Sequence, residues 1–344
     1  MEVPSIFLNR ILSEMVQKNG SDLHLAVGSP PMIRINGQFV PLTGQEMVAN
    51  EMIDKITETF LGPDEIIKLK ENKGVILVKN IFNFRFRINV FYQKGLLALS
   101  FHYIPGVIKS FNDLGLAEVC HNFLQAASGL LIIAGSYNSG KTTTAASLIE
   151  ELNKIKTLNI VTIEDPIEYL FVSKTSLIMQ RQIGADVNTV ANALDYCLSE
   201  DVDVVYINEI KDDLVLNSAM PKIFELASGN CLVVLEINAD SSERVLEKIL
   251  AGVSANLPVE AARYNLADIL IGVLVQKLVK RLGGGLALAN EVLLNNAAVK
   301  SLIREGKIYQ LESIMQTSRK EGMISMDKSL NNLIGSGEVR REDI

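Results

Sequence analysis

The segment Leu130-Leu-Ile-Ile-Ala-Gly135-Ser-Tyr-Asn-Ser-Gly140-Lys-Thr-Thr143 carries the most informative pattern in the sequence. Its first five residues form a short, continuous apolar run, which is typical of a buried parallel strand. The residues that follow, Thr143–Asn153, have the pattern of a helix. Between them, Gly135–Thr142 matches G-x4-G-K-[ST], in which a glycine-rich loop joins a strand to a helix and cradles phosphate groups.

This loop predicts a binding site for ATP and Mg²⁺. Glycines allow the backbone to wrap with its N–H groups pointing inward, and the following helix adds partial positive charge. We expect Lys141 to reach the β- and γ-phosphates and the Thr142 hydroxyl to ligate Mg²⁺. The alternative is an ordinary glycine-containing turn between a strand and a helix. The expected nucleotide-binding residues are Ser136, Tyr137, Asn138, Ser139, Gly140, Lys141, Thr142 and Thr143.

Three later apolar runs predict further buried strands of the same domain. They lie at Ile160–Ile163, Val204–Ile207 and Leu232–Leu235, and helical stretches separate them. This alternation is typical of an α/β domain with helices on both faces of a parallel sheet. From about Glu260 onward the pattern predicts mostly helix, interrupted at Gly283–Gly285.

Acidic residues follow two of these strands directly. Glu164 and Asp165 end the Ile160–Ile163 run, and Glu209 follows the Val204–Ile207 run. The carboxyl ends of parallel strands meet at the edge of the sheet that also carries the phosphate loop. One acid there can hold the magnesium shell, and another can align or deprotonate an attacking water. The alternative is that these acids are solvated and cap helices.

The first hundred residues predict a separate α+β unit. A helix is expected at Met1–Gln17, and Asn36-Gly37 lies between two strand-like runs, which is a strong hairpin signal. The string Phe84-Arg85-Phe86-Arg87-Ile88 places Arg85 and Arg87 on one face of a strand. That face is either solvated or presents two cations to an anion.

Composition limits the class of protein. The chain has 344 residues, enough for two domains, and 33 basic against 40 acidic side chains, a net charge of −7. This balance argues against a protein that coats nucleic acid. Its three cysteines include no Cys-x-x-Cys pair and its three histidines lack metal-ligand spacing, which fits a reducing cytoplasm. The most apolar later segment, Leu266–Val279, is too short and too charged to span a membrane.

Several separated blocks resemble one family. The phosphate loop, followed by Thr162–Tyr169 (TIEDPIEY), resembles the secretion ATPases of type IV pili and type II secretion. Ser21–Leu25 (SDLHL) and Pro30–Gly37 (PPMIRING) are similar to the N-terminal signature of the pilus retraction motors. Ala298–Glu305 (AVKSLIRE) resembles their C-terminal helix, so the resemblance covers nearly the whole chain.

The resemblance implies a cytoplasmic ATPase motor subunit that disassembles a type IV pilus. It implies a hexameric ring, an inner-membrane platform protein as partner, and peripheral association with that membrane. Glu164 matches the acid that activates water, Glu209 the acid of the Mg²⁺–water shell, and Arg85 and Arg87 match N-domain arginines near the γ-phosphate. The implied parts are a PAS-like domain at 1–104, a linker at 105–120, a RecA-like ATPase core at 121–285 and a helical region at 286–344.

The sequence departs from the family in its catalytic blocks. The family's Gly-Glu-x-Arg is Asn208-Glu209-Ile210-Lys211 here, and lysine lacks the planar fork of arginine. In the family, two further blocks carry histidines. Here they read Ser228-Gly229-Asn230 and Leu235-Glu236-Ile237-Asn238, so both histidines are absent and Glu236 adds a carboxylate near the site. Asp195, Ser199 and His102 replace family arginines. An alternative is therefore a low-turnover ATP-binding subunit that works in a mixed ring beside an active retraction motor. A third possibility is a motor for type II secretion or DNA uptake, against which the lack of a tetracysteine zinc module speaks.

Overall fold

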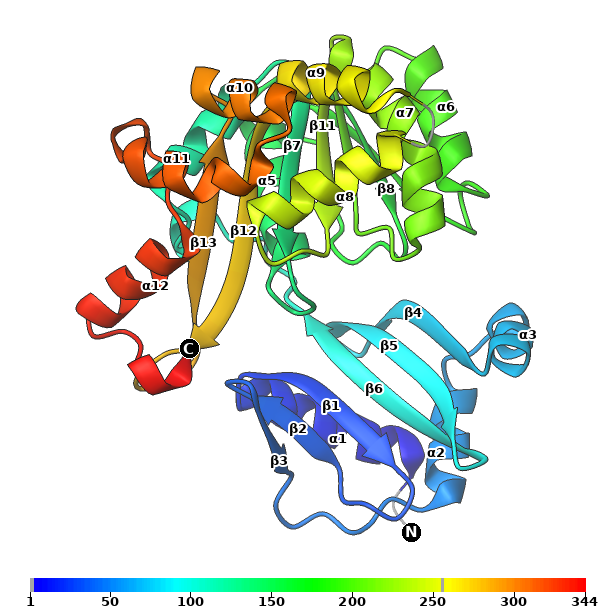
Figure 1. Ribbon diagram of the computed structural model, residues 1–344. Coiled ribbons are helices and arrows are strands. Elements are labelled where there is room, and N and C mark those ends of the chain that lie inside the picture. Colours follow the sequence, from blue (N-terminus) through cyan, green and yellow to red (C-terminus); the bar gives the residue numbers. More distant parts are fainter. Residues whose placement is uncertain (1–2, 255–256) are drawn as a thin grey trace. The chain divides into compact units, whose positions relative to one another are not determined.

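The computed structural model describes residues 3–254 and 257–344. The chain divides into two compact units. One contains the residues up to Val107 together with Gly283–Leu286, and the other contains Ile108–Leu282 and Ala287–Ile344. Figure 1 labels the helices and strands of both. Each unit is described by itself below.

The first unit is a six-stranded antiparallel sheet with helices. The strand order is β3-β2-β1-β6-β5-β4. The helix α1 buries Phe7, Leu8, Ile11, Leu12 and Met15, an apolar stripe at helical spacing. The elements are α1 (Pro4–Gln17), β1 (Gly20–Ala26), β2 (Met32–Ile35), β3 (Gln38–Pro41), α2 (Asn50–Glu58), α3 (Pro63–Asn72), β4 (Gly74–Ile81), β5 (Phe84–Gln93) and β6 (Leu96–Ile104).

Two local predictions for the first unit are confirmed. Asn36 and Gly37 both have positive φ, 51° and 78°, and they join β2 to β3 as a hairpin turn. Along β5, Phe86 and Ile88 are fully buried, whereas the alternating Arg85 and Arg87 are partly exposed on the other face. The expected N-terminal helix began at Met1, but Met1 and Glu2 lie outside the described residues.

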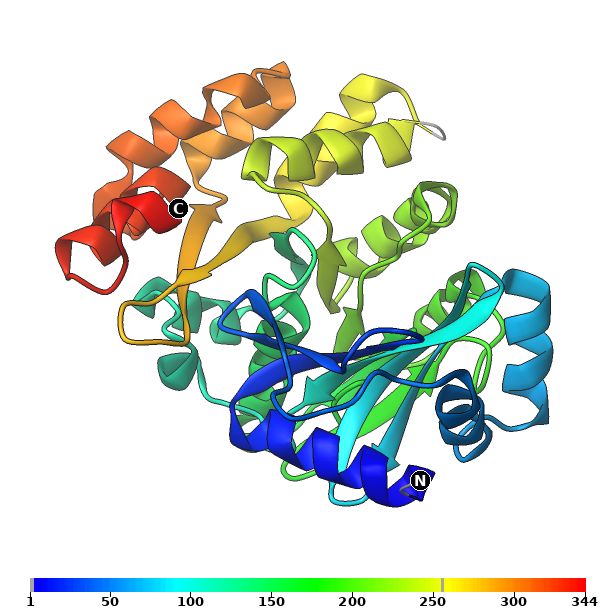
Figure 2. The ribbon, with the colours of Figure 1, turned by 90° about the horizontal axis from the view of Figure 1, so that it is seen from below.

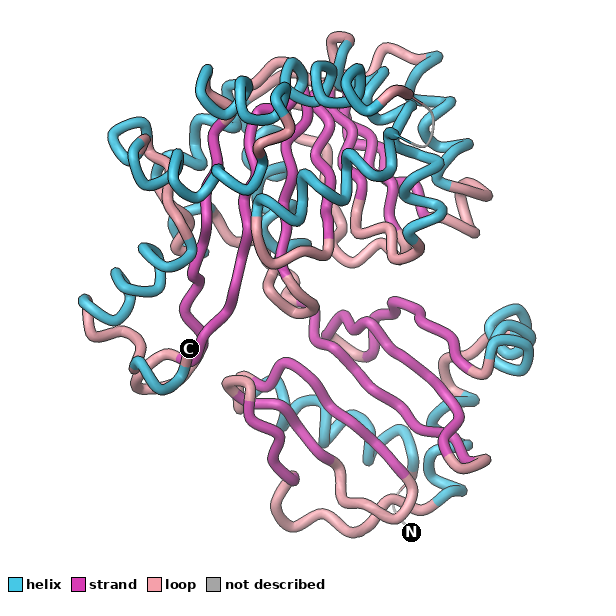
Figure 3. The backbone as a smooth tube through the Cα atoms, in the orientation of Figure 1, coloured by secondary structure: helices cyan, strands magenta, loops and turns pink. Residues whose placement is uncertain are grey.

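The second unit is built on a seven-stranded sheet in the order β13-β12-β7-β11-β10-β8-β9. The strands from β12 to β9 pair in parallel. Figure 3 shows this sheet in magenta between cyan helices. The elements are α4 (Phe111–Leu114), η1 (Glu118–Gln125), β7 (Gly129–Gly135), α5 (Lys141–Ile155), β8 (Asn159–Glu164), β9 (Leu177–Gln182), α6 (Val190–Ser199), β10 (Val204–Ile207), α7 (Asp213–Ser228), β11 (Leu232–Ile237), α8 (Ser242–Ser254), α9 (Val259–Ile269), β12 (Leu270–Lys280), β13 (Leu286–Leu294), α10 (Ala297–Glu305), η2 (Ile308–Gln310), α11 (Leu311–Thr317), η3 (Arg319–Glu321), α12 (Met326–Gly335) and η4 (Arg341–Asp343).

Both faces of this sheet are buried under helices, as the continuous apolar runs predict. Every residue of β7 is buried. On β11, Val233 and Leu235 join an apolar cluster with α7, α8 and α9, whereas Leu232 and Val234 join a second cluster with α5. The predicted fold class, an α+β unit followed by an α/β unit, is confirmed. Burial on both sides fixes the sheet and holds the loop after β7 in place.

The prediction of helix after about Glu260 is wrong for two segments. Residues 270–280 form β12, which pairs with β7, and residues 286–294 form β13, so the region at 286–344 begins with a strand of the central sheet. For β12 the reason is that a continuous apolar run is the signature of both a buried strand and a buried helix, and periodicity alone does not distinguish them. β13 is an edge strand of the sheet, and Figure 2 shows α10, α11 and α12, orange to red, on the same side of the sheet as β13. The other expected domain boundaries stay predictions.

Two further segments differ from expectation. The pattern of residues 116–128 is that of a helix, but the structure has a shorter 3₁₀ helix there, at Glu118–Gln125. The edge strand β9 was not expected. All three cysteines are free and buried. No helix in the described parts of the chain is long and apolar enough to cross a membrane.

Candidate nucleotide-binding site

The loop between β7 and α5 depends on glycine for its shape. Gly135 has a φ of 153°, and a Cβ there would lie 2.3 Å from Ser139 Oγ and 2.5 Å from the Gln276 carbonyl oxygen. Gly140, with a φ of 90°, leads directly into α5 at Lys141. The first backbone N–H groups of a helix have no partners within it, so this turn presents donors beside the loop.

Lys141 folds back over its own loop. It is 6% exposed, and its Nζ donates to the carbonyl oxygens of Gly135 and Ser136, each at 3.0 Å. The same nitrogen lies 3.0 Å from Glu209 Oε2. The lysine is thus surrounded by oxygen acceptors in a buried position, where a phosphate oxygen would be an equivalent partner.

Thr142 is linked to a buried carboxylate. Its Oγ1 donates to Glu236 Oε2 at 3.2 Å, and the Tyr206 hydroxyl donates to Glu236 Oε1 at 2.6 Å. Glu236 is 2% exposed and Tyr206 1%. Burial raises the pKa of Glu236 to about 8, although the hydrogen bond from Tyr206 and the charge of Lys141 act in the opposite direction. Burial also raises the pKa of Tyr206 well above its ordinary value.

Glu164 ends β8 in a buried position. Its Oε1 accepts hydrogen bonds from Thr162 Oγ1 at 2.6 Å and from Gln180 Nε2 at 3.1 Å. Burial raises the pKa of Glu164 to about 7, against the effect of these two bonds. A carboxyl group that titrates near neutral pH can accept a proton from water more readily than an ordinary glutamate can.

The two acidic strand ends lie beside each other. β8 and β10 pair in parallel with Ile163 opposite Ile207, so Glu164 and Glu209 come from neighbouring strand ends. Glu209 Oε1 accepts from Asn238 Nδ2 at 3.3 Å, and Asn208 Oδ1 accepts from the Asp165 backbone N–H at 3.2 Å. The structure therefore brings Lys141, Thr142 and Glu209 together at one rim, with Glu164 on the adjacent strand.

The remaining expected residues fall into four groups. Ser136, Tyr137 and Asn138 are exposed in the loop, and Tyr137 is 69% exposed. Ser139 is buried, and its Oγ has no hydrogen-bond partner among the described residues. Thr143 shares a hydrogen bond of 3.1 Å with the Tyr169 hydroxyl. Arg85 and Arg87 belong to the first unit, so their role at this site stays a prediction.

Several polar partners at the site were not expected from the sequence. Gln276 Nε2 donates to Thr144 Oγ1 at 2.8 Å, and the Gln276 carbonyl flanks Gly135. It lies on β12, which had been expected to be helical. Tyr206 and Gln180 could have been noticed as polar residues inside apolar runs, but their partners come from neighbouring strands and carry no sequence signal.

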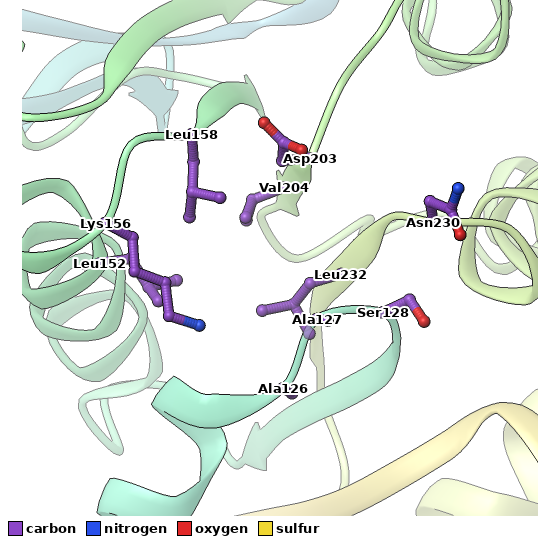
Figure 4. Close-up of a pocket in the computed structure, with 10 residues that line it drawn as sticks. All are labelled: Ala126, Ala127, Ser128, Leu152, Lys156, Leu158, Asp203, Val204, Asn230 and Leu232. Carbon is purple, nitrogen blue, oxygen red and sulfur yellow. The ribbon is translucent and has the colours of Figure 1, made fainter.

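One altered family position lies away from the loop. Asn230 lines a pocket of about 270 Å³ that also includes Lys156 and Asp203 (Figure 4). This pocket lies at the amino ends of β10 and β11, whereas Glu236 lies near the carboxyl end of β11. The change at Asn230 therefore does not alter the surroundings of this chain's own phosphate loop.

Comparison with known proteins identifies the family. The family model described as type II/IV secretion system protein matches residues 109–330. The type IV pilus retraction ATPase PilT of Pseudomonas aeruginosa is 30% identical over 98% of this chain and 96% of its own length. The type IV pilus ATPase PilU of the same organism is 30% identical over 97% of this chain and 86% of its own.

A solved structure agrees with this likeness. The crystal structure of the pilus retraction motor PilT with bound ADP has a TM-score of 0.81 and 33% identity, and it covers 97% of this chain and 94% of its own. The predicted resemblance to the secretion ATPases is confirmed. The match spans both units rather than the phosphate loop alone. This chain belongs to the type II/IV secretion system protein family.

Proposed function

We propose that this chain is an ATP-driven motor subunit that retracts type IV pili. The observation that carries the proposal is the buried Lys141, held against its loop carbonyls and Glu209 at the end of a strand–loop–helix unit. The full-length likeness to retraction motors gives this site its context. ATP hydrolysis would drive removal of pilin subunits and hence twitching-type motility.

The site fits a magnesium nucleotide. Gly135 leaves no space for a side chain, and the buried Ser139 Oγ has no partner among the described residues. When bound, Mg-ATP supplies an activated phosphoryl group. The backbone N–H groups of Ser136–Thr143 and the Lys141 ammonium would hold its phosphates, while Thr142 and Glu209 would hold the metal.

Glu164 is the proposed general base. Burial raises the pKa of Glu164 to about 7, so near neutral pH a part of the carboxyl groups is ionised. The ionised carboxylate can take up a proton from a water molecule. Thr162 and Gln180 fix its orientation through the two hydrogen bonds to Oε1. Glu209 would orient water on the metal.

The motor would work as a homohexamer whose first unit is a PAS-like domain. Arg85 and Arg87, on the partly exposed face of β5, would complete the site. Its partner would be the inner-membrane pilus platform protein, which places the ring on the cytoplasmic side of that membrane. Rotation of the first unit relative to the second would transmit the force.

Nucleotide binding and phosphate release by the purified protein test this proposal. Lys141→Ala should weaken binding of a fluorescent ATP analogue, and Glu209→Gln should lower phosphate release while leaving binding measurable. Lys156→Ala is the matched control, because Lys156 lies in the pocket at the opposite edge of the sheet. If Lys141→Ala and Lys156→Ala bind equally well, or if Glu209→Gln releases phosphate as fast as the unmutated protein, the motor proposal fails for the isolated chain.

A second candidate function is an ATP-binding accessory subunit with little turnover. The buried Glu236 beside Thr142 favours it, because this added carboxyl group, when ionised, opposes a polyanionic ligand. Lys211 in place of the family arginine acts in the same direction. Mixing the protein with an active retraction motor separates the two functions. An accessory subunit would raise the partner's phosphate release while showing almost none alone.

A further inference from the structure

Glu236 occupies a position where the fold favours an apolar side chain. It follows Leu232 and Val234 at intervals of two along β11, on the face that packs against Leu148 and Leu152 of α5. β11 lies directly beside β7, with Glu236 opposite Ile133, two residues before the phosphate loop begins (Figure 1). Strand pairing therefore fixes the distance from this carboxylate to the loop.

Both oxygens of Glu236 are used by hydroxyl donors. Oε1 accepts from Tyr206, which lies on β10 at the other side of β11, and Oε2 accepts from Thr142. A buried carboxylate destabilises the folded state unless it is hydrogen-bonded, so the hydrogen bonds to both oxygens allow a glutamate at this position. Tyr206 is itself fully buried, so its hydroxyl is held in place and its hydrogen bond limits the movement of the Glu236 side chain.

The hydrogen bond to Glu236 fixes the direction of the Thr142 hydroxyl proton. A threonine hydroxyl has a single proton and two acceptor lone pairs. With its proton donated to Glu236 Oε2, Thr142 Oγ1 keeps both lone pairs available to a cation. Metal ligands are commonly oriented in this way by a carboxylate behind them, and losing such a partner typically reduces metal affinity about 10–100-fold.

We propose that Glu236 is a positioning residue that orients the Thr142 hydroxyl as a ligand for the Mg²⁺ of the bound nucleotide. The proposal rests on the proposed binding of Mg-nucleotide at this loop. In its ionised form Glu236 would have two opposed effects: its charge would weaken binding of the bare nucleotide, and its orientation of Thr142 would strengthen the gain from magnesium.

The test measures how much magnesium improves nucleotide affinity. The dissociation constant of a fluorescent ADP analogue is determined in EDTA and in millimolar Mg²⁺, and the ratio of the two is the readout. Glu236→Leu should lower this ratio about tenfold or more, with binding in EDTA equal to or tighter than that of the unmutated protein. Glu236→Gln, which keeps an oxygen acceptor for Thr142, should lower it less.

Two further variants distinguish positioning from a general structural effect. Glu291→Gln is the control, because Glu291 is also a buried carboxylate and accepts two hydrogen bonds from Ser242, at 2.8 Å and 2.6 Å, away from the loop. It should leave the ratio unchanged. On a Thr142→Val background, Glu236→Leu should have no additional effect on the ratio, because the hydroxyl that it positions is gone.

Each outcome decides between the proposals. If Glu236→Leu and Glu236→Gln both keep the ratio of the unmutated protein, or tighten binding equally in both buffers, Glu236 is only a repulsive charge and the inference is wrong. If Glu236→Leu does not fold, Glu236→Val decides by the same criterion, because it too lacks an acceptor for the Thr142 hydroxyl. If the unmutated protein itself binds no nucleotide in Mg²⁺, the proposed function fails instead.

Discussion

Replacing Glu164 with glutamine should stabilise the second unit above neutral pH while abolishing activity. Glu164 is 1% exposed, and burial raises its pKa from 4.5 to about 7. Between these values the folded protein keeps a proton that the unfolded chain has released, so stability falls as the pH rises through this window. At about 1.4 kcal/mol per pH unit, the loss reaches about 3 kcal/mol above pH 7 and stays under about 1 kcal/mol at pH 5.

Glutamine removes the titration but keeps an oxygen that can accept from Thr162 and Gln180. For a unit of this size, about 1 kcal/mol corresponds to roughly 2–4 °C in Tm, so the variant should melt about 6–12 °C higher at pH 8.5. At pH 5 the difference should be small. Differential scanning calorimetry in EDTA without nucleotide measures both differences.

A control and a second variant sharpen the test. Glu247→Gln removes the same charge from an exposed position on α8 and controls for net charge. Thr162→Val removes one hydrogen bond that lowers the Glu164 pKa, so it should move the titration to higher pH. A Glu164→Gln difference that is the same at pH 5 and pH 8.5 would refute the reasoning, because a buried ionisable group is its only basis.

Three other changes have expected outcomes. If Glu164 is the base, phosphate release should fall about tenfold per pH unit below about pH 7, and equal rates at pH 6 and pH 8 would contradict that role. Gly135→Ala should abolish nucleotide binding while circular dichroism still shows a folded chain, because its Cβ would meet Ser139 Oγ and the Gln276 carbonyl; normal binding would show that the loop can rearrange. Leu152→Ala should destabilise the second unit by about 2–5 kcal/mol with an unchanged nucleotide dissociation constant, since Leu152 is fully buried under the sheet; a change in affinity without loss of Tm would be unexpected.

The sequence predicted those parts of the fold that local pattern determines. The strand–loop–helix around Lys141, the hairpin at Asn36-Gly37 and the alternation along β5 each follow from the spacing of neighbouring residues. β12 could not be predicted in this way, because a continuous apolar run is compatible with a buried strand and with a buried helix. Its place in the sheet depends on pairing with β7, which no local feature encodes.

The same distinction applies to the site. The loop and the acids after β8 and β10 were found because their residue types follow strands directly. The partners of those acids come from strand order: Gln180 reaches Glu164 because β9 lies beside β8, and Tyr206 reaches Glu236 because β10 lies beside β11. Glu236 could be noticed as an added carboxylate, but its contact with Thr142 required the three-dimensional structure.

The exposed position of Tyr137 is suitable for a fluorescent probe of the phosphate loop. Its side chain is 69% exposed in the middle of the phosphate loop. The chain contains no tryptophan, so Tyr137→Trp would create a single tryptophan, and excitation at wavelengths that tyrosine does not absorb would report from this loop alone. Stopped-flow mixing could then follow the arrival and departure of unlabelled nucleotide in real time.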